Sequence, residues 1–124
     1  MKNDSKKIRK VVHTDDFDEY YNSLDKRVAA KYDEAIFYLE TIYILSTKFV
    51  KKLEGADTGM FEMRVSVGTN EHRTILFAID HENIIQAKTV ILVNGFLKKD
   101  SKEYKRHIKK AINILNNLEY GTEL

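Results

Sequence analysis

Residues 61–79 read FEMRVSVGTNEHRTILFAI, and this stretch predicts the centre of the fold. From Phe61 to Val67 every second residue is apolar and the residues between are polar, which is the period of a half-buried strand. The segment 68–71 holds Gly, Thr, Asn and Glu and predicts a four-residue loop. Residues 72–79 then predict the returning strand. An antiparallel hairpin is therefore expected in the middle of the chain.

The residues before this hairpin predict one strand and a pair of helices. Residues 8–13 include two adjacent valines and predict a short first strand. Apolar residues then recur at helical spacing in two runs, which predict antiparallel helices over 15–23 and 25–45. Residues 46–60 lose this period and contain Gly55 and Gly59, so they predict a connection with at most one short turn near residues 49–53.

The residues after the hairpin predict a last strand and a last helix. Residues 84–93 show little polar alternation, as expected of a central strand covered on both faces. Asn94 and Gly95 are expected to break this strand. Asp100 and Glu103 have the spacing of a capping box at the start of a final helix. The order β-α-α-β-β-β-α favours an α+β fold with a mainly antiparallel sheet of about four strands.

Composition limits the classes of protein that the chain can be. Its 124 residues suit one domain over residues 1–124, and 43% of them are hydrophobic and 32% charged, which fits a packed soluble protein. The chain has no Cys, which excludes a disulfide framework, a thiol nucleophile and thiolate zinc sites. Neither a signal peptide nor the roughly 20 apolar residues of a membrane span is recognisable. The cytoplasm is the expected location.

Charge is sorted along the chain although the net charge is only +2. Residues 1–13 and 98–110 are basic, with five and seven Lys or Arg, and they flank an acidic segment over 15–40. Such runs are commonly solvated helix faces, and the alternative is a surface that binds polyanions. The four His show no spacing typical of a metal site, so neither a metal nor another cofactor is expected.

The predicted hairpin brings two arginines together. With a four-residue loop, Val67 lies opposite His72, and Arg64 and Arg73 become diagonal neighbours on one face of the sheet. Two guanidinium groups side by side repel each other unless an acid lies between them or the site holds an anion such as phosphate. Glu62 offers the first explanation, a surface network of ion pairs. Lys98 and Lys99 favour the second, a cationic pocket.

Three short stretches suggest a family. They are residues 60–65 (MFEMRV), 70–77 (NEHRTILF) and 94–99 (NGFLKK). In this order and spacing they resemble the RelE/ParE superfamily of bacterial toxins, most closely its phage-derived HigB-like branch. Members typically show an aromatic-Glu-Leu-Arg strand, a Tyr-Arg strand start and a His-Gly-Phe-x-Lys-Lys segment. This chain departs from that pattern by Asn94 in place of His and by His72 in place of Tyr.

The resemblance implies a fold, an activity and partners. The family fold is a small, strongly curved antiparallel sheet with a helical hairpin on one side. Many members are endoribonucleases that cut mRNA, often on the ribosome, by metal-independent attack of a ribose 2′-hydroxyl on the adjacent phosphate. Each is held inactive by an antitoxin, here expected to be a HigA-like helix-turn-helix protein.

The resemblance also implies site residues. Arg64 and Arg73 would stabilise the charge that develops on the phosphate, and Lys98 or Lys99 would position it. His72 is kept as a candidate for proton transfer. The residues expected to bind RNA are Lys51, Lys52, Lys102, Tyr104, Lys105 and Arg106. Two alternatives stay open, namely a ParE-like poison of DNA gyrase and a binding module for RNA or antitoxin without catalysis.

Overall fold

The computed structural model describes residues 6–54 and 59–121, and it has the expected α+β architecture. In chain order the elements are β1 (Lys10–His13), α1 (Asp15–Asn22), α2 (Lys26–Thr41), β2 (Val50–Lys52), β3 (Met60–Val67), β4 (Asn70–Ala78), β5 (Thr89–Leu97) and α3 (Ser101–Gly121). The predicted fold class is thus confirmed, with five strands instead of about four. The additional strand, β2, lies in the segment predicted as a connection, whose Gly55 is outside the described residues.

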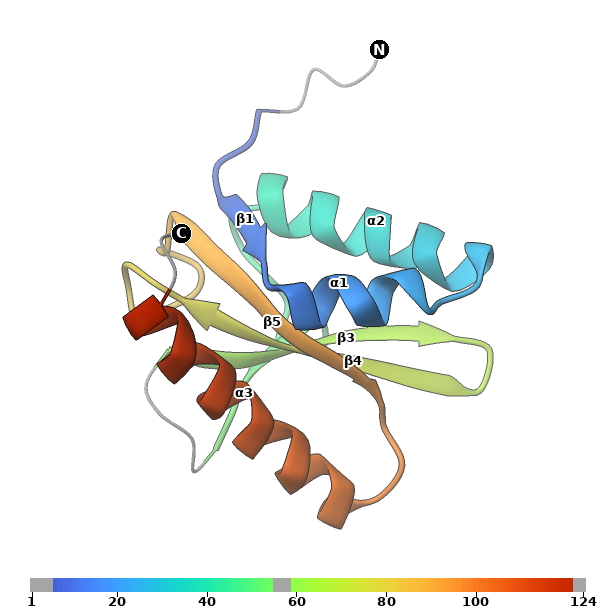
Figure 1. Ribbon diagram of the computed structural model, residues 1–124. Helices are drawn as coiled ribbons and strands as arrows, with labels where there is room; N and C mark the ends of the chain where they lie inside the picture. The colour runs from blue at the N-terminus through green and yellow to red at the C-terminus, as the bar shows by residue number, and fades with distance from the viewer. Residues whose placement is uncertain (1–5, 55–58, 122–124) are drawn as a thin grey trace.

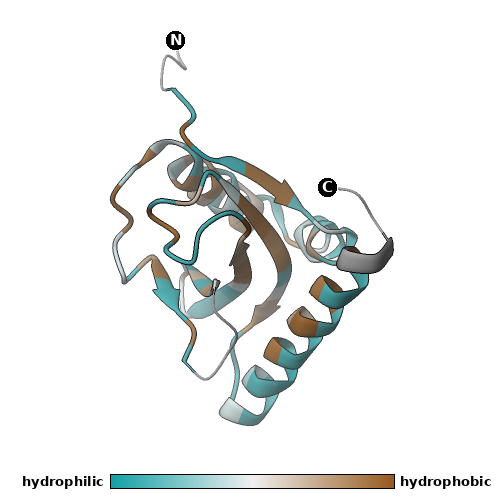
Figure 2. Cartoon of the chain, turned by 90° about the vertical axis from the view of Figure 1, so that its left-hand side faces the viewer, coloured by the Kyte–Doolittle hydropathy of each residue, from teal (hydrophilic) through white to brown (hydrophobic). Residues whose placement is uncertain are grey.

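The five strands form one sheet in the order β1-β5-β4-β3-β2. β1 runs parallel to β5, and the other neighbours are antiparallel. The helical pair α1 and α2 covers one face of the sheet and α3 lies on the other (Figure 1). Figure 2 shows that α3 carries both hydrophobic and hydrophilic residues, as expected of a helix that packs one side on a sheet.

Two hydrophobic cores hold these layers together. The larger lies between the sheet and the helical pair, and Phe17, Tyr32 and Leu39 of the helices are almost fully buried in it. The smaller lies under α3 and includes Ile75, Ile91 and Ala111. No helix of residues 6–54 or 59–121 is both long and apolar enough to cross a membrane.

The helices begin at the side chains that the sequence offers as caps. The Thr14 hydroxyl accepts a hydrogen bond from the Phe17 amide at 3.1 Å, and the Asp25 carboxylate accepts one from Val28 at 2.9 Å. Asp100 accepts one from the Glu103 amide at 2.9 Å, as the predicted capping spacing requires. Each cap satisfies an amide that has no partner inside its helix.

The hairpin of β3 and β4 is tighter than predicted. Val67 pairs with Asn70, so the turn has two residues, Gly68 and Thr69, instead of the four predicted. Gly68 has a φ of 63°, which a glycine adopts without strain in a two-residue turn. The predicted register is wrong by two residues, and a shift of two keeps every side chain on its predicted face.

β5 also differs from the prediction, because it begins at Thr89 and continues through Gly95 to Leu97. An irregularity in its pairing with β4, at Ile75 and Leu76, lets the strand continue there. Gly95 has a packing role, since a Cβ atom at this position would lie 2.3 Å from the Tyr20 ring. The Asn-Gly pair therefore marks a close contact between α1 and the sheet and not the end of the strand.

Candidate functional site

A pocket of about 400 Å³ lies where β2 and β3 meet the segment that leads into α3. We call it the cationic pocket, since five of its lining residues are Lys or Arg and three are Asp or Glu. Its walls come from three separate parts of the chain. The lining residues are Lys51, Lys52, Leu53, Glu54, Glu62, Arg64, Lys98, Lys99, Asp100, Ser101 and Tyr104.

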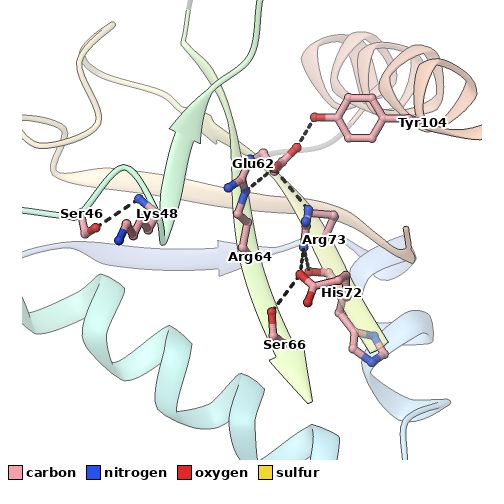
Figure 3. Close-up of polar contacts among 9 residues, drawn as sticks. Ser46, Lys48, Glu62, Arg64, Ser66, His72, Arg73 and Tyr104 are labelled. Atoms are coloured by element: carbon pink, nitrogen blue, oxygen red, sulfur yellow. Dashed lines mark hydrogen bonds and ion pairs between the residues drawn. The ribbon is translucent and has the colours of Figure 1, made fainter. Parts of the chain in front are cut away.

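Arg64 and Arg73 lie directly opposite each other on β3 and β4, closer than the predicted diagonal arrangement. The Glu62 carboxylate lies between them (Figure 3). Its Oε2 accepts a hydrogen bond from Arg64 Nε at 2.7 Å and lies 3.3 Å from Arg73 Nε. The repulsion between the two guanidinium groups is therefore offset by one shared carboxylate.

Burial separates the roles of the two arginines. The Arg73 side chain is only 6% exposed, and its Nη1 donates to Glu71 at 3.1 Å and to the main-chain oxygen of His72 at 3.2 Å. The Arg64 side chain is 32% exposed and lines the pocket. Arg64 can therefore contact a ligand, whereas Arg73 supports Glu62 from behind.

Glu62 is held ionised although it is buried. Burial raises the pKa of its carboxyl, but the hydrogen bonds from Tyr104 and Arg64 and the charges of Arg64 and Arg73 outweigh this and hold the pKa below its ordinary value. Burial and the bond to Glu62 together raise the pKa of Tyr104. Glu62 thus serves as a fixed acceptor that orients Arg64 and Tyr104 toward the pocket.

The structure does not bring His72 to this pocket. It is next to Arg73 on β4, so its side chain points to the opposite face of the sheet, toward the helical pair. Its Nδ1 lies 2.5 Å from the Tyr20 hydroxyl, and its ring meets Tyr32 edge-on. Burial lowers the pKa of His72. The structure thus places the proton-transfer candidate His72 outside the cationic pocket.

The other expected residues divide into two groups. Lys51, Lys52, Lys98, Lys99 and Tyr104 line the cationic pocket. The second group does not line it but lies on the part of α3 that follows the pocket, with Lys102, Lys105 and Arg106 exposed.

Four further residues line the pocket without having been expected there. They are Leu53 and Glu54 after β2 and Asp100 and Ser101 at the start of α3, and no sequence signal for a site marks them. Asn94, where the family often has His, is buried under α3 and donates to the His107 carbonyl at 3.2 Å. The alternative network of Glu62, Arg64 and Arg73 is present as well and is mostly buried, and Glu62 and Arg64 of this network line the pocket.

The comparisons with known proteins agree with this fold. Residues 19–116 match the family described as "Phage derived protein Gp49-like (DUF891)". Among solved structures, a mutant of the E. coli toxin RelE in the free state is similar with a TM-score of 0.57 and 12% identity, covering 83% of this chain and 97% of that chain. No curated protein sequence matches.

The sheet, the helical pair on one face and the C-terminal helix on the other give this chain the fold of the E. coli toxin RelE. The family match covers most of the chain and confirms the expected phage-derived branch. The chain belongs to the Gp49-like family of phage-derived proteins.

Proposed function

We propose that the protein is the toxin of a type II toxin–antitoxin system and cuts mRNA, as an endoribonuclease that acts on the ribosome. The observation that carries this proposal is the cationic pocket, which the partly exposed Arg64 lines together with Lys98 and Lys99. A guanidinium and two ammonium groups suit the charge and the hydrogen-bonding pattern of a backbone phosphate. The proposed partner that restrains it is a HigA-like helix-turn-helix antitoxin.

The chemistry would be a transesterification inside the RNA. The ribose 2′-oxygen forms a bond to phosphorus and the bond to the 5′-oxygen breaks, which leaves a 2′,3′-cyclic phosphate and a 5′-hydroxyl. Overall the proton moves from the 2′-hydroxyl to the leaving oxygen. Arg64 would stabilise the negative charge on the phosphorane, and Lys98 and Lys99 would position the phosphate. The proposed step does not use a metal ion.

Glu62, Arg73 and Tyr104 would act indirectly in this reaction. Glu62 fixes the Arg64 guanidinium by its 2.7 Å hydrogen bond, and Arg73 keeps Glu62 ionised. Such fixed charges stabilise a transition state without having to reorganise during the reaction. Lys51 and Lys52 would hold the backbone on one side of the cut, and Lys102, Lys105 and Arg106 would hold it on the side of α3.

The test is to incubate the purified protein with mRNA, free and on ribosomes, and to map the new 5′ ends. We expect cuts by the wild type and a loss of about 100-fold or more in Arg64→Ala and Lys98→Ala, as for other removed charge stabilisers. Lys26→Ala is the control, because Lys26 is exposed at the start of α2, away from the pocket. Intact mRNA under both conditions would contradict the proposal.

Two other results would select the alternatives. Double-strand breaks in DNA without RNA cleavage would indicate a gyrase poison. Salt-sensitive RNA binding without any cut would indicate a binding module.

A further inference from the structure

A second hollow lies beside the cationic pocket and has no role in the proposed cleavage. It has a volume of about 170 Å³, and we call it the edge hollow. Its walls include Tyr38 of α2, Phe49 before β2 and Arg64 of β3. Arg64 lines the cationic pocket as well. A ligand held by Arg64 in the pocket can therefore extend into the edge hollow.

The short length of β2 explains why this hollow exists. β2 pairs only with residues 61–63 of β3, whereas β3 continues to Val67. Past Met63 the outer side of β3 thus has no neighbouring strand, and α2 faces it there. The main-chain oxygen of Phe49 accepts a hydrogen bond from the Arg64 amide at 2.9 Å. This bond fixes Phe49 and Arg64 relative to each other.

Two aromatic rings face this space with different exposure. The Tyr38 residue is 50% exposed, whereas Phe49 is partly buried and packs against the larger core. Within residues 6–54 and 59–121, neither ring packs on another aromatic ring. Proteins that bind single-stranded RNA stack its bases on such rings. Tyr38 therefore offers a stacking surface, and Phe49 offers a fixed wall beside it.

Arg64 connects this stacking surface with the phosphate site. Its Nε donates to Glu62 at 2.7 Å, which fixes the plane of the guanidinium. Its two Nη groups make no hydrogen bond within the described part of the chain. They remain available for a phosphate, which a guanidinium binds with two parallel hydrogen bonds. One arginine can thus hold the backbone of a nucleotide strand while a base of that strand lies in the edge hollow.

The rest of the lining suits a base better than an aliphatic side chain. Of the eight residues that line the edge hollow, three are charged, one is Ser66 and two are aromatic. Lys31 and Glu34 lie 3.9 Å apart, so Lys31 offsets the repulsion between Glu34 and a nearby phosphate. These side chains provide hydrogen-bond donors and acceptors, and the edges of a base carry both kinds of group.

We propose that the edge hollow binds one unstacked base of the RNA whose phosphate lies in the cationic pocket. The base stacks on the Tyr38 ring, with its edge toward the polar lining. The identification of the ligand as RNA rests on the proposed function, and the inference adds a base contact next to the cut. Stacking is tolerant of sequence, because every base has an aromatic face.

The first measurement compares two strands that differ only in their bases. One is a short single-stranded 2′-O-methyl RNA, and the other is the same strand with hydrogen in place of every base. Neither strand has the free 2′-hydroxyl that the proposed cleavage needs, and both carry the same phosphates. The wild type should bind the strand with bases about fivefold or more tightly, as expected for one stacked base. Equal affinity for the two strands would overturn the proposal.

Variants of Tyr38 then locate the stacked base. Tyr38→Leu should weaken binding of the strand with bases by about fivefold or more and leave the abasic strand within about twofold. Tyr38→Phe keeps the ring and should bind both strands as the wild type does. Tyr43→Leu is the matched control, because Tyr43 is 55% exposed and lines neither hollow. A loss in Tyr38→Leu that is equal for both strands, or no loss at all, would overturn the proposal.

Cleavage measurements separate this inference from the proposed function. If the wild type cuts mRNA and Tyr38→Leu cuts it equally well below saturation, the nuclease is supported and the base site is overturned. If Tyr38→Leu loses the preference for the strand with bases in a protein that cuts no RNA, the base site is supported and the nuclease is contradicted. A wild type that binds neither strand would overturn the inference.

Discussion

At the scale of single residues, the site depends on Glu62. Its carboxylate is 5% exposed and contacts Arg64, Arg73 and Tyr104 at once. Taking a carboxylate out of water is costly, and here two cations and a hydroxyl offset that cost. Because the arginines lie directly opposite each other, removal of the carboxylate would leave two neighbouring positive charges without their shared partner.

Glu62→Gln is therefore expected to destabilise the fold by about 3–5 kcal/mol near pH 7, the usual cost of breaking a buried ion pair. The pKa of Glu62 is below its ordinary 4.5 in the folded protein. Its charge thus contributes stability above about pH 4.5, and this contribution is lost as the pH falls through the folded-state pKa. The free energies of unfolding of the two proteins should converge in that range, as measured by urea titration.

Glu19→Gln is the control for this experiment, since Glu19 is exposed on α1. It should change the free energy of unfolding by no more than about 0.5 kcal/mol at any pH. A difference between wild type and Glu62→Gln that persists unchanged at about pH 3 would show that the charge of Glu62 is not its source.

The sequence could place these residues on a face but could not show their burial. Alternation along β3 and β4 puts Arg64 and Arg73 on one face of the sheet. The observed register differs from the predicted one by two residues, and a shift of two leaves both side chains on that face. The same alternation puts His72 on the other side, and it was available from the sequence alone. The sequence does not predict that Arg73 lies buried behind Glu62, because the burial of Arg73 depends on how far α3 covers the sheet.

At the scale of secondary-structure elements, the end of α2 depends on a residue outside it. Arg9, next to β1, is 2% exposed and donates to five main-chain oxygens. Two of these, of Leu39 at 3.0 Å and Ile42 at 2.6 Å, lie at the end of α2. The other three belong to the segments that follow α2 and precede β5, at Tyr43, Ile84 and Ile85. A cation there also complements the negative end of the helix dipole.

Arg9→Met should lower the free energy of unfolding by at least about 3 kcal/mol, because several buried carbonyls lose a charged donor together. Hydrogen exchange should show the largest loss of protection at residues 39–45 and 84–87, where these carbonyls lie. Lys10→Met is the matched control on the exposed side of β1 and should cost no more than about 0.5 kcal/mol. Uniform loss of protection over the chain would contradict the local role of Arg9.

Arg9 also limits what charge counting can predict. Arg9 belongs to the basic segment 1–13, for which the sequence suggests a polyanion-binding surface, yet its side chain is buried inside the protein. The two strand errors have a similar cause. β2 has only three residues, too few to show a period, and β5 continues through Asn94 and Gly95, where Tyr20 packs against Gly95. Long periodic elements were predictable, whereas elements set by a tertiary contact were not.

At the scale of the whole molecule, the pocket exists because α3 does not cover all of its face. α3 packs mainly on β5, and its first turn lines the pocket together with residues of β2 and β3. The polar side chains Glu62 and Arg64 of β3 line this uncovered part. The basic residues of α3 then continue from the pocket along the outside of the helix. Pocket and helix form one positive surface, although the net charge is only +2.

This surface predicts how RNA binding depends on salt. Each phosphate that a cation neutralises on single-stranded RNA contributes about 0.7 to the slope of log K against log salt concentration. The double variant Lys102→Gln/Lys105→Gln should therefore reduce the slope by about 1.4 if both residues contact phosphates. Lys26→Gln/Arg27→Gln removes the same charge from the exposed start of α2 and should leave the slope unchanged. Since both variants lower the net charge equally, equal slopes would show that total charge, and not the α3 surface, determines binding.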